Sequence, residues 1–413
     1  MRILIHGLNY APEPTGVGKF TGEMAAWFAR RGHEVQVVTS PPYYPEWRLA
    51  KGYSSWRWGH ETIEGIGVYR CPLYVPGRPR GLGRLFHLAS FAMSSLPVAI
   101  WRALAFRPQV LIAIAPALAS APGTRLAAWL AGAPAWLHIQ DFEIDAAFAL
   151  GIVSGGGLRR AALAIESRLL RSFDRVSTIT PAMVARLAEK GVAAERRLLF
   201  ANWVDTSAIR PGPSSLRRLL NLPPDAVVAL YAGNMGEKQG VETLAEVAQG
   251  LAGTPVHMLL AGAGAAQARL AAATSGMAQV HWLPIQPVER LNDLLAAGDI
   301  HLLPQRADAA DLVMPSKLAF MLASGRPVVA GTAPDTAVAK AIEGCGMVVA
   351  PGDGPAMAAA VAALAADDQA RQRMGENARA RALADWDREA ILGAYERALV
   401  ERVGREGPTA ADR

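Results

Sequence analysis

Of the 413 residues, 51% are hydrophobic and 19% are charged, and this composition excludes a disordered chain. The length exceeds what one hydrophobic core usually spans, so we expect two globular domains. Two distant cysteines, Cys71 and Cys345, exclude a disulfide framework and a cysteine-based zinc site, and they indicate a reducing, cytoplasmic setting. The net charge of +6 arises in residues 1–205, which contain 23 Lys and Arg but only 14 Asp and Glu. This half is therefore suited to a polyanion, either nucleic acid or an acidic membrane surface.

Short β-rich runs alternate with helical runs along the first half of the chain. The expected strands are residues 2–8, 34–40, 68–75, 109–116, 135–140 and 175–180. Between the first two, residues 20–32 predict a helix that ends at Gly32. The N-terminal apolar run is short and passes directly into the first strand, so we expect no secretory signal. The alternation is typical of a doubly wound parallel sheet.

The same alternation begins again after a stretch rich in proline and glycine at residues 202–215. The expected strands are residues 227–233, 256–264, 279–285, 300–305, 327–331 and 346–350, with helices at 241–251 and 317–325. We therefore predict an N-terminal domain at 1–205, a C-terminal domain at 206–385, and a last helix at 386–403 that crosses back to the first domain. Ligands of such open α/β sheets bind at the carboxyl ends of the strands.

The first strand continues into YAPEPTGVGKF, residues 10–20. Pro12 and Pro14 favour an extended exit from the strand, while Gly16 and Gly18 let the backbone approach a ligand where a helix begins with free N–H groups. This arrangement suits a phosphate or a sugar phosphate, and a plain turn into the helix is the alternative. The GxGxxG spacing of a dinucleotide-binding fold is absent.

Two lysines of the second half follow strand ends. Lys238 comes after the strand that ends at Gly233, and Lys317 falls in the first turn of a helix that Ser316 opens. A cation there opposes the helix dipole, so Lys317 indicates a bound anion, whereas Lys238 is either a second diphosphate ligand or a solvated surface lysine. Further donor-binding candidates are Asn234, Gly262, Leu283, Pro284 and Ser316, which we also expect to cap its helix.

His138, Asp141 and Glu143 crowd the end of the apolar strand at 135–140. A histidine and a carboxylate at such an edge can position or deprotonate a hydroxyl group, and a hydrogen-bonded surface cluster is the alternative. The spacing is a poor metal signature and no second cluster completes it, so we expect no metal.

Residues 78–109 combine a long apolar run with arginines near both ends and aromatic residues along it. Pro97, His87 and three serines argue against a complete membrane span. The pattern predicts a basic amphipathic segment that lies in the interface of an anionic membrane, and a buried helix pair with arginines at its rim is the alternative.

Together these stretches resemble the GT-B glycosyltransferases of family 4 over nearly the whole chain. The resemblance rests on PEPTGVGKFTGEMA, RRGHEVQVVTSPPYYPEW, NWVD, GNMGEKQGVETL and MPSKLAFMLASGRPVVA. The chain looks most similar to colanic-acid-type exopolysaccharide transferases through RCPLYVPGRPRGLGRLFHLASFAMSSLP and HIQDFEIDAAFALG. The resemblance implies two Rossmann-like domains that face each other across a cleft, the first binding an acceptor and the second a nucleotide-sugar donor.

The same resemblance implies a retaining transferase that needs no metal or other cofactor. The donor would be a GDP- or UDP-linked sugar, with fucose suggested by the subgroup. The acceptor would be a lipid-linked oligosaccharide at the inner face of the cytoplasmic membrane, and no nucleic acid is expected. Gly16 and Gly18 would admit the donor. The implied catalytic residues are Lys238 and Lys317 for the departing diphosphate, and His138, Asp141 and Glu143 for the acceptor.

The chain departs from the family pattern at two places. Asn234 stands where the family often has an arginine, and Lys238 lies two residues before Gly240 rather than next to it. Leu312 and Phe320 replace the family's paired glutamates. The missing glutamates suggest one alternative, a non-catalytic sugar-nucleotide-binding subunit. The other alternative is a nucleotide-sugar epimerase or hydrolase on the same fold, which would leave the apolar segment unexplained.

Overall fold

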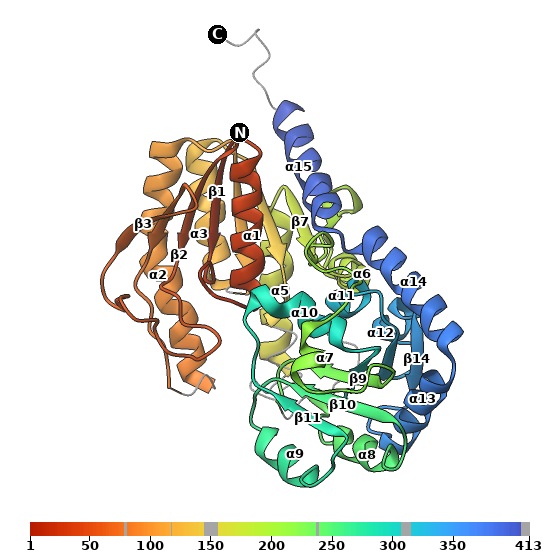
Figure 1. The fold of residues 1–413 in the computed structure, drawn as a ribbon. Helices are drawn as coiled ribbons and strands as arrows, with labels where there is room; N and C mark the ends of the chain where they lie inside the picture. The colour runs from red at the N-terminus through yellow and green to blue at the C-terminus, as the bar shows by residue number, and fades with distance from the viewer. Residues whose placement is uncertain (78–80, 117, 144–155, 237–238, 307–314, 406–413) are drawn as a thin grey trace. The chain divides into compact units, whose positions relative to one another are not determined.

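The computed structural model describes residues 1–77, 81–116, 118–143, 156–236, 239–306 and 315–405. The chain divides into two compact units, each an α/β unit built on a mainly parallel sheet (Figure 1). Unit 1 is Met1–Asn202 with Ile391–Arg413, and unit 2 is Trp203–Ala390. The α/β class predicted from the sequence is confirmed.

Unit 1 contains an eight-stranded sheet in the order β3-β4-β2-β1-β5-β6-β7-β8. The strands are β1 (Arg2–Gly7), β2 (Glu34–Thr39), β3 (Gly59–Ile63), β4 (Ile66–Arg70), β5 (Val110–Ala115), β6 (Ala135–Ile139), β7 (Arg175–Thr178) and β8 (Arg197–Leu199). β3 pairs antiparallel with β4, and the other described pairs are parallel. Every residue of β5 is buried because helices cover both faces of the sheet.

Helices pack on both faces of this sheet. They are α1 (Gly16–Arg30), α2 (Gly81–Phe106), α3 (Ala121–Ala131), α5 (Gly156–Ser172), α6 (Pro181–Glu189) and, from the end of the chain, α15 (Arg388–Arg405). Leu4, Leu111 and Leu137 of the sheet share one core with buried residues of α2, α3 and α5. Trp136, the neighbour of Leu137, points to the opposite face, where its ring lies 5.3 Å from that of Tyr395 on α15.

Aromatic stacking and an ion-pair cluster fix α15 to unit 1. The Tyr395 ring stacks on Phe200 with 3.8 Å between ring centroids. The Glu396 carboxylate lies 2.7 Å from His33 Nε2 and 3.0 Å from Arg31 Nη2. This is the last helix of the sequence prediction, and from Ile391 on it belongs to unit 1.

Unit 2 contains a six-stranded sheet in the order β11-β10-β9-β12-β13-β14, and all its described pairs are parallel. The strands are β9 (Val227–Ala232), β10 (Val256–Ala261), β11 (Val280–Leu283), β12 (Ile300–Leu303), β13 (Val328–Gly331) and β14 (Gly346–Val349). The helices are α7 (Ser215–Leu219), α8 (Thr243–Gly250), α9 (Gln267–Ala273), α10 (Leu291–Ala297), α11 (Lys317–Ala323), α12 (Ala337–Ala341), α13 (Gly354–Ala366) and α14 (Asp368–Asp385). The register pairs Ala232 with Ala261, so β9 and β10 end side by side.

Candidate functional site

Lys317 lies near the carboxyl end of β9 in unit 2, at the first position of α11. Its Nζ is 4.3 Å from the centre of the Tyr231 ring on β9, and its Cδ is 3.6 Å from where a Cβ on Gly233 would lie. The Nζ atom is buried and has no hydrogen-bond partner among the described residues. Burial lowers the pKa of Lys317 from 10.5 to about 7. A buried cation at a strand end that has an aromatic ring but no hydrogen-bond partner among the described residues is suited to an anionic ligand.

The loops after β9 and β10 pack backbone to backbone beside Lys317. Gly233 N donates to Ala261 O at 3.0 Å. A Cβ on Gly262 would lie 1.9 Å from Gly233 O, and the φ of 148° at Gly262 also favours glycine. The packing of the two loops therefore already requires Gly262, and its contact with a donor stays a prediction.

The other donor candidates on these loops differ in exposure. Asn234 is exposed, and its carbonyl accepts a hydrogen bond from the Tyr231 hydroxyl at 2.7 Å. Leu283 is half-buried and ends β11, where its carbonyl accepts from Gly262 N at 3.4 Å. Pro284 follows and is exposed. Asn234 and Pro284 are thus the members of this group whose side chains reach solvent.

Ser316 does not cap α11, contrary to the sequence prediction. Its φ of −56° and ψ of −28° are already helical and its side chain makes no capping bond. Instead, Leu318 N donates to Pro315 O at 2.9 Å, so a backbone turn begins the helix. Ser316 is exposed, which leaves it open to a ligand. Lys238 and Leu312 lie outside the described residues.

The two glycines in the first turn of α1 have different surroundings. Gly16 begins α1 with a φ of 64°, and a Cβ there would lie 3.4 Å from the Tyr44 ring. A Cβ on Gly18 would lie 2.4 Å from Glu13 Oε2. We predicted that Gly18 lets a ligand approach, but the side chain of Glu13 fills the space beside it. Gly18 is therefore explained by packing.

Glu13 is a buried carboxylate that joins two loops of unit 1. Its Oε1 accepts from the backbone N–H groups of Tyr43 and Tyr44 at 3.1 Å each, and its Oε2 accepts from Asn9 Nδ2 at 2.9 Å. Burial raises the pKa of Glu13, and these hydrogen bonds oppose that change. Sequence reasoning missed this residue, although a glutamate between two prolines, just before the glycines, was the available signal.

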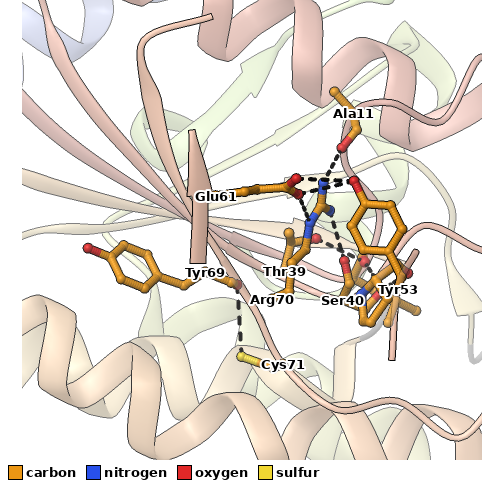
Figure 2. A network of polar contacts seen from close by, with 10 residues as sticks. Ala11, Thr39, Ser40, Tyr53, Glu61, Tyr69, Arg70 and Cys71 are labelled. Atoms are coloured by element: carbon orange, nitrogen blue, oxygen red, sulfur yellow. Dashed lines mark hydrogen bonds and ion pairs between the residues drawn. The ribbon is translucent and has the colours of Figure 1, made fainter. Parts of the chain in front are cut away.

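Arg70, at the end of β4, ties the same loops to the sheet, as Figure 2 shows. Its guanidinium donates to Ala11 O at 2.6 Å, to Ser40 O at 2.9 Å and to Glu61 Oε1 at 2.6 Å. Glu61 also accepts from the Tyr53 hydroxyl at 3.1 Å. Arg70 is 4% exposed, so the loops after β1 and β2 are held by a buried cation whose donors are in use.

His138 is a buried residue of β6. Its Nδ1 lies 3.0 Å from Ser177 Oγ, and its Nε2 lies 3.0 Å from the Gln140 amide nitrogen. Gln140 in turn exchanges two hydrogen bonds of 2.9 Å with Asn202. Burial lowers the pKa of His138 to about 3, so the imidazole stays neutral near pH 7. The geometry favours a role in orienting Gln140, and a direct contact of His138 with the acceptor stays a prediction.

Asp141 and Glu143 have separate environments. Asp141 is exposed. Glu143 accepts from Leu118 N at 2.8 Å through Oε2, and its Oε1 lies 3.8 Å from Arg84 of α2. The structure thus gives the predicted cluster one buried histidine, one exposed carboxylate and one carboxylate that holds a loop. Among the described residues, no three side chains of His, Cys, Asp or Glu gather closely enough to hold a metal ion.

Comparisons with known proteins give both units a family. Residues 15–203 match the glycosyl transferase 4-like domain, and residues 226–367 match glycosyl transferases group 1. The chain is 45% identical over 336 residues to the putative colanic acid biosynthesis glycosyl transferase WcaI of Escherichia coli (strain K12). That match covers 79% of this chain and 82% of the relative.

Two solved structures have the same fold over nearly the whole chain. Sucrose-phosphate synthase from Thermosynechococcus elongatus has a TM-score of 0.72 at 18% identity, over 98% of this chain and 100% of that chain. HepE from Anabaena, in complex with UDP and glucose, has a TM-score of 0.69 at 18% identity, over 97% of this chain and 100% of that chain.

Proposed function

Because the chain belongs to the family 4 glycosyltransferases of GT-B fold, we propose that it moves a sugar from a nucleoside diphosphate to a hydroxyl of a lipid-linked oligosaccharide, with retention of anomeric configuration and without a metal. The membership confirms the fold and the family resemblance seen in the sequence. We place the reaction in exopolysaccharide biosynthesis, and the relative that is 45% identical is named for colanic acid biosynthesis.

The buried ammonium of Lys317, which has no hydrogen-bond partner among the described residues, is the observation that carries the donor site. A buried cation without a counter-charge destabilises the folded chain, and a diphosphate bound beside it would supply that counter-charge. Bound phosphate would also raise the pKa of Lys317 again, because the opposite charge favours the protonated amine. The UDP in the HepE structure supports a nucleoside diphosphate as the ligand class, and we expect a GDP- or UDP-linked donor here.

Transfer of the sugar requires that the negative charge on the departing diphosphate be stabilised. The bond between the anomeric carbon and the diphosphate oxygen breaks, and a bond to the acceptor oxygen forms on the same face of the sugar. The acceptor proton passes to the departing phosphate. Lys317 stabilises the negative charge that develops on that phosphate, a kind of contact whose removal typically costs about 3 kcal/mol of barrier. Asn234 and Ser316, both exposed near this edge, are available to the sugar phosphate.

The acceptor is assigned to unit 1, whose loops after β1, β2 and β6 carry the polar groups described above. Of the predicted cluster of His138, Asp141 and Glu143, Asp141 is the exposed carboxylate, and it is the candidate for holding the reacting hydroxyl. A lipid-linked acceptor is supported by the apolar helix α2 of this unit. We accordingly propose that the protein works peripherally at the inner face of the cytoplasmic membrane.

A thermal-shift panel tests the donor site. The wild type, Lys317→Met and Lys340→Met are each heated with GDP-, UDP-, dTDP- and ADP-linked sugars, with magnesium or with a chelator. Lys340 is an exposed lysine of α12 and serves as the matched control. We expect one nucleotide class to raise the Tm of the wild type and of Lys340→Met, equally with and without magnesium, and not that of Lys317→Met. A shift that Lys317→Met retains would contradict the assigned site, and a shift that requires magnesium would contradict metal independence.

A further inference from the structure

Helix α2 exposes one continuous apolar stripe. Its exposed large side chains are Leu82, Leu85, Phe86, Met93, Trp101 and Leu104. Met93 is 75% exposed, and seventeen residues separate Arg84 from Arg102 without a charged side chain among them. Of the helices in the described ranges, α2 is the one long and apolar enough to cross a membrane. Within an apolar window of 18 residues, 22% of the helix is buried, which is too little for a core helix and too much for a helix that contacts nothing else in the unit. The helix is therefore neither an ordinary core helix nor a free span.

The neighbouring helix α3 and a loop tryptophan extend this apolar surface. On α3, Trp129 is 68% exposed, and Leu126 and Leu130 are exposed beside it at helical spacing. α2 and α3 lie against each other, with Leu96 packed on Gly123. Trp58 donates from its indole N–H to Ser94 O of α2 at 3.1 Å and is 59% exposed. We call the exposed apolar side chains of α2 and α3, with Trp58, the α2–α3 face.

The composition of the α2–α3 face matches a bilayer interface. Tryptophans concentrate where lipid headgroups meet acyl chains, and arginines extend from there to lipid phosphates. Arg107 is exposed and directly follows the carboxyl end of α2. Arg102 of α2 and Arg125 of α3 are half-buried, and their Nε atoms donate to Gln36 Oε1 at 2.9 Å and to Ser172 O at 2.8 Å. The excess of basic residues in the first 205 favours an anionic surface over a second copy of this equally basic unit. Residues 78–80, part of the predicted membrane segment, lie outside the described residues.

The buried side of α2 prevents it from leaving the unit to span a membrane. His87, Phe91, Ser95, Ala99 and Ala103 of α2 are buried against the rest of unit 1. Removing the helix would expose this side and break its hydrogen bonds, so α2 suits a position parallel to the membrane surface. Residues 81–106 form one helix with a buried side and an exposed side, not the buried helix pair of the alternative interpretation.

His87 connects α2 to the loops at the carboxyl ends of β1 and β2. Its Nδ1 lies 2.7 Å from Tyr74 O, a carbonyl that only accepts, so Nδ1 carries the proton. Its Nε2 therefore accepts from the Tyr43 hydroxyl at 3.0 Å. The backbone N–H of Tyr43 donates to Glu13, the carboxylate that holds the loop before α1. One side of α2 is thus apolar and exposed, and the other side holds the loops assigned to the acceptor.

A second connection starts one turn earlier. The Arg84 guanidinium lies 5.3 Å from the Trp47 ring centre and 3.8 Å from Glu143 Oε1. Trp47 also packs on Tyr43, with 5.3 Å between ring centroids. The first turns of α2 consequently contact both the loop after β2 and the loop after β6.

We propose that the α2–α3 face docks on the interface of an anionic bilayer, and that His87 is a positioning residue through which docked α2 orders the loops at residues 9–16 and 41–47. The docking does not depend on the proposed function. The assignment of those loops to the acceptor rests on the proposed function. A lipid-linked acceptor would then meet ordered loops only at the membrane that carries it.

Vesicle sedimentation tests the docking. The probes are vesicles of phosphatidylethanolamine with phosphatidylglycerol, and vesicles of phosphatidylcholine alone. Because burying Met93 and Trp129 accounts for much of the apolar contact, the double variant Met93→Ser, Trp129→Ser should bind anionic vesicles at least about tenfold more weakly than the wild type. Ile285→Ser, which changes a 70% exposed apolar residue of unit 2, should bind as the wild type does. Equal binding by the double variant, or a wild-type dimer in light scattering that this variant abolishes, would overturn the proposal.

Amide hydrogen exchange tests the connection through His87. In the wild type, anionic vesicles should slow exchange in α2 and also at 9–16 and 41–47. Tyr43→Phe removes the hydroxyl that His87 accepts from, so it should keep the protection of α2 and lose that of the loops. Tyr74→Phe is the matched control, because His87 uses only the backbone carbonyl of Tyr74. The coupling would be overturned if vesicles did not slow exchange at 9–16 and 41–47 in the wild type, or if they slowed it equally in Tyr43→Phe. Neither readout uses a nucleotide sugar, so failure of the proposed function would leave both intact.

Discussion

Replacing Lys317 with methionine should stabilise the empty protein while removing its donor site. A pKa of about 7 in place of 10.5 means that the folded state binds this proton more weakly than the unfolded chain does. At pH 7 that difference lowers the free energy of unfolding by roughly 4 kcal/mol. Methionine avoids this penalty but loses the attraction of the ammonium to the Tyr231 ring, about 1–2 kcal/mol. The net gain is roughly 2–3 kcal/mol, or about 5–10 °C in Tm for a unit of this size.

The pH dependence makes this prediction specific. Below pH 7 the wild type pays the full cost of protonated Lys317, and the cost disappears as pH rises from 7 towards 10.5, where the unfolded chain also releases the proton. The advantage of Lys317→Met should therefore be largest at pH 7 and below, and should shrink steadily towards pH 10. Thermal unfolding at several pH values, with Lys340→Met as control, measures it. No gain at pH 7, or the same gain at every pH, would refute the description of Lys317 as a buried cation that lacks a hydrogen-bond partner within the described part of the chain.

Gly18→Ala should lower the free energy of unfolding by about 1–3 kcal/mol in urea titrations, because the new Cβ would collide with buried Glu13. Gly157→Ala is the control and should not destabilise the protein, because no atom lies within 4 Å of its new Cβ. Cys71 is buried and burial raises the pKa of its thiol to about 12, so a thiol reagent at pH 8 should label it only after denaturation; rapid labelling of the native protein would contradict this. Glu396→Gln should destabilise unit 1 by about 1–3 kcal/mol at pH 7. Because hydrogen bonds from Arg31 and His33 hold the pKa of Glu396 below its usual value, that loss should vanish as pH falls through the acid range, and a loss independent of pH would count against the ion pairs.

The sequence predicted the described parallel strands other than β8 because each of them is a short apolar run between turn residues. It did not predict β3, whose residues are mostly exposed and so carry no apolar pattern. The hairpin turn before β4 places Glu64 at a φ of 49° and Gly65 at 79°. Glutamate is not a usual residue for positive φ, so the turn signal was weak. β8 was missed because Arg197–Leu199 is only three residues long.

The position of Lys317 in the first turn of a helix was predictable from the sequence, and its contact with a donor stays a prediction. The candidate site was not predictable where a side chain folds back on its own loop. Gly18 has the pattern of a ligand-binding glycine, but the space beside it belongs to Glu13, five residues earlier. His138 has the pattern of a catalytic residue, but it is buried in β6. Both of its ring nitrogens already lie within hydrogen-bond distance of protein groups, one on β7 and one on Gln140. Such contacts depend on which side chains the sheet register brings together.

The proposed activity is the transfer of a sugar to a lipid-linked acceptor. The most direct measurement is to incubate the protein with a radiolabelled donor of the nucleotide class found in the thermal-shift panel, a bacterial lipid extract and a metal chelator, and to follow the label. Our account predicts label in the organic phase, with the new glycosidic bond in the anomeric configuration of the donor, and little label there with Lys317→Met. Release of free sugar without label in the lipid would indicate a hydrolase, and binding without any turnover would indicate a non-catalytic subunit. Either of these results would contradict the account.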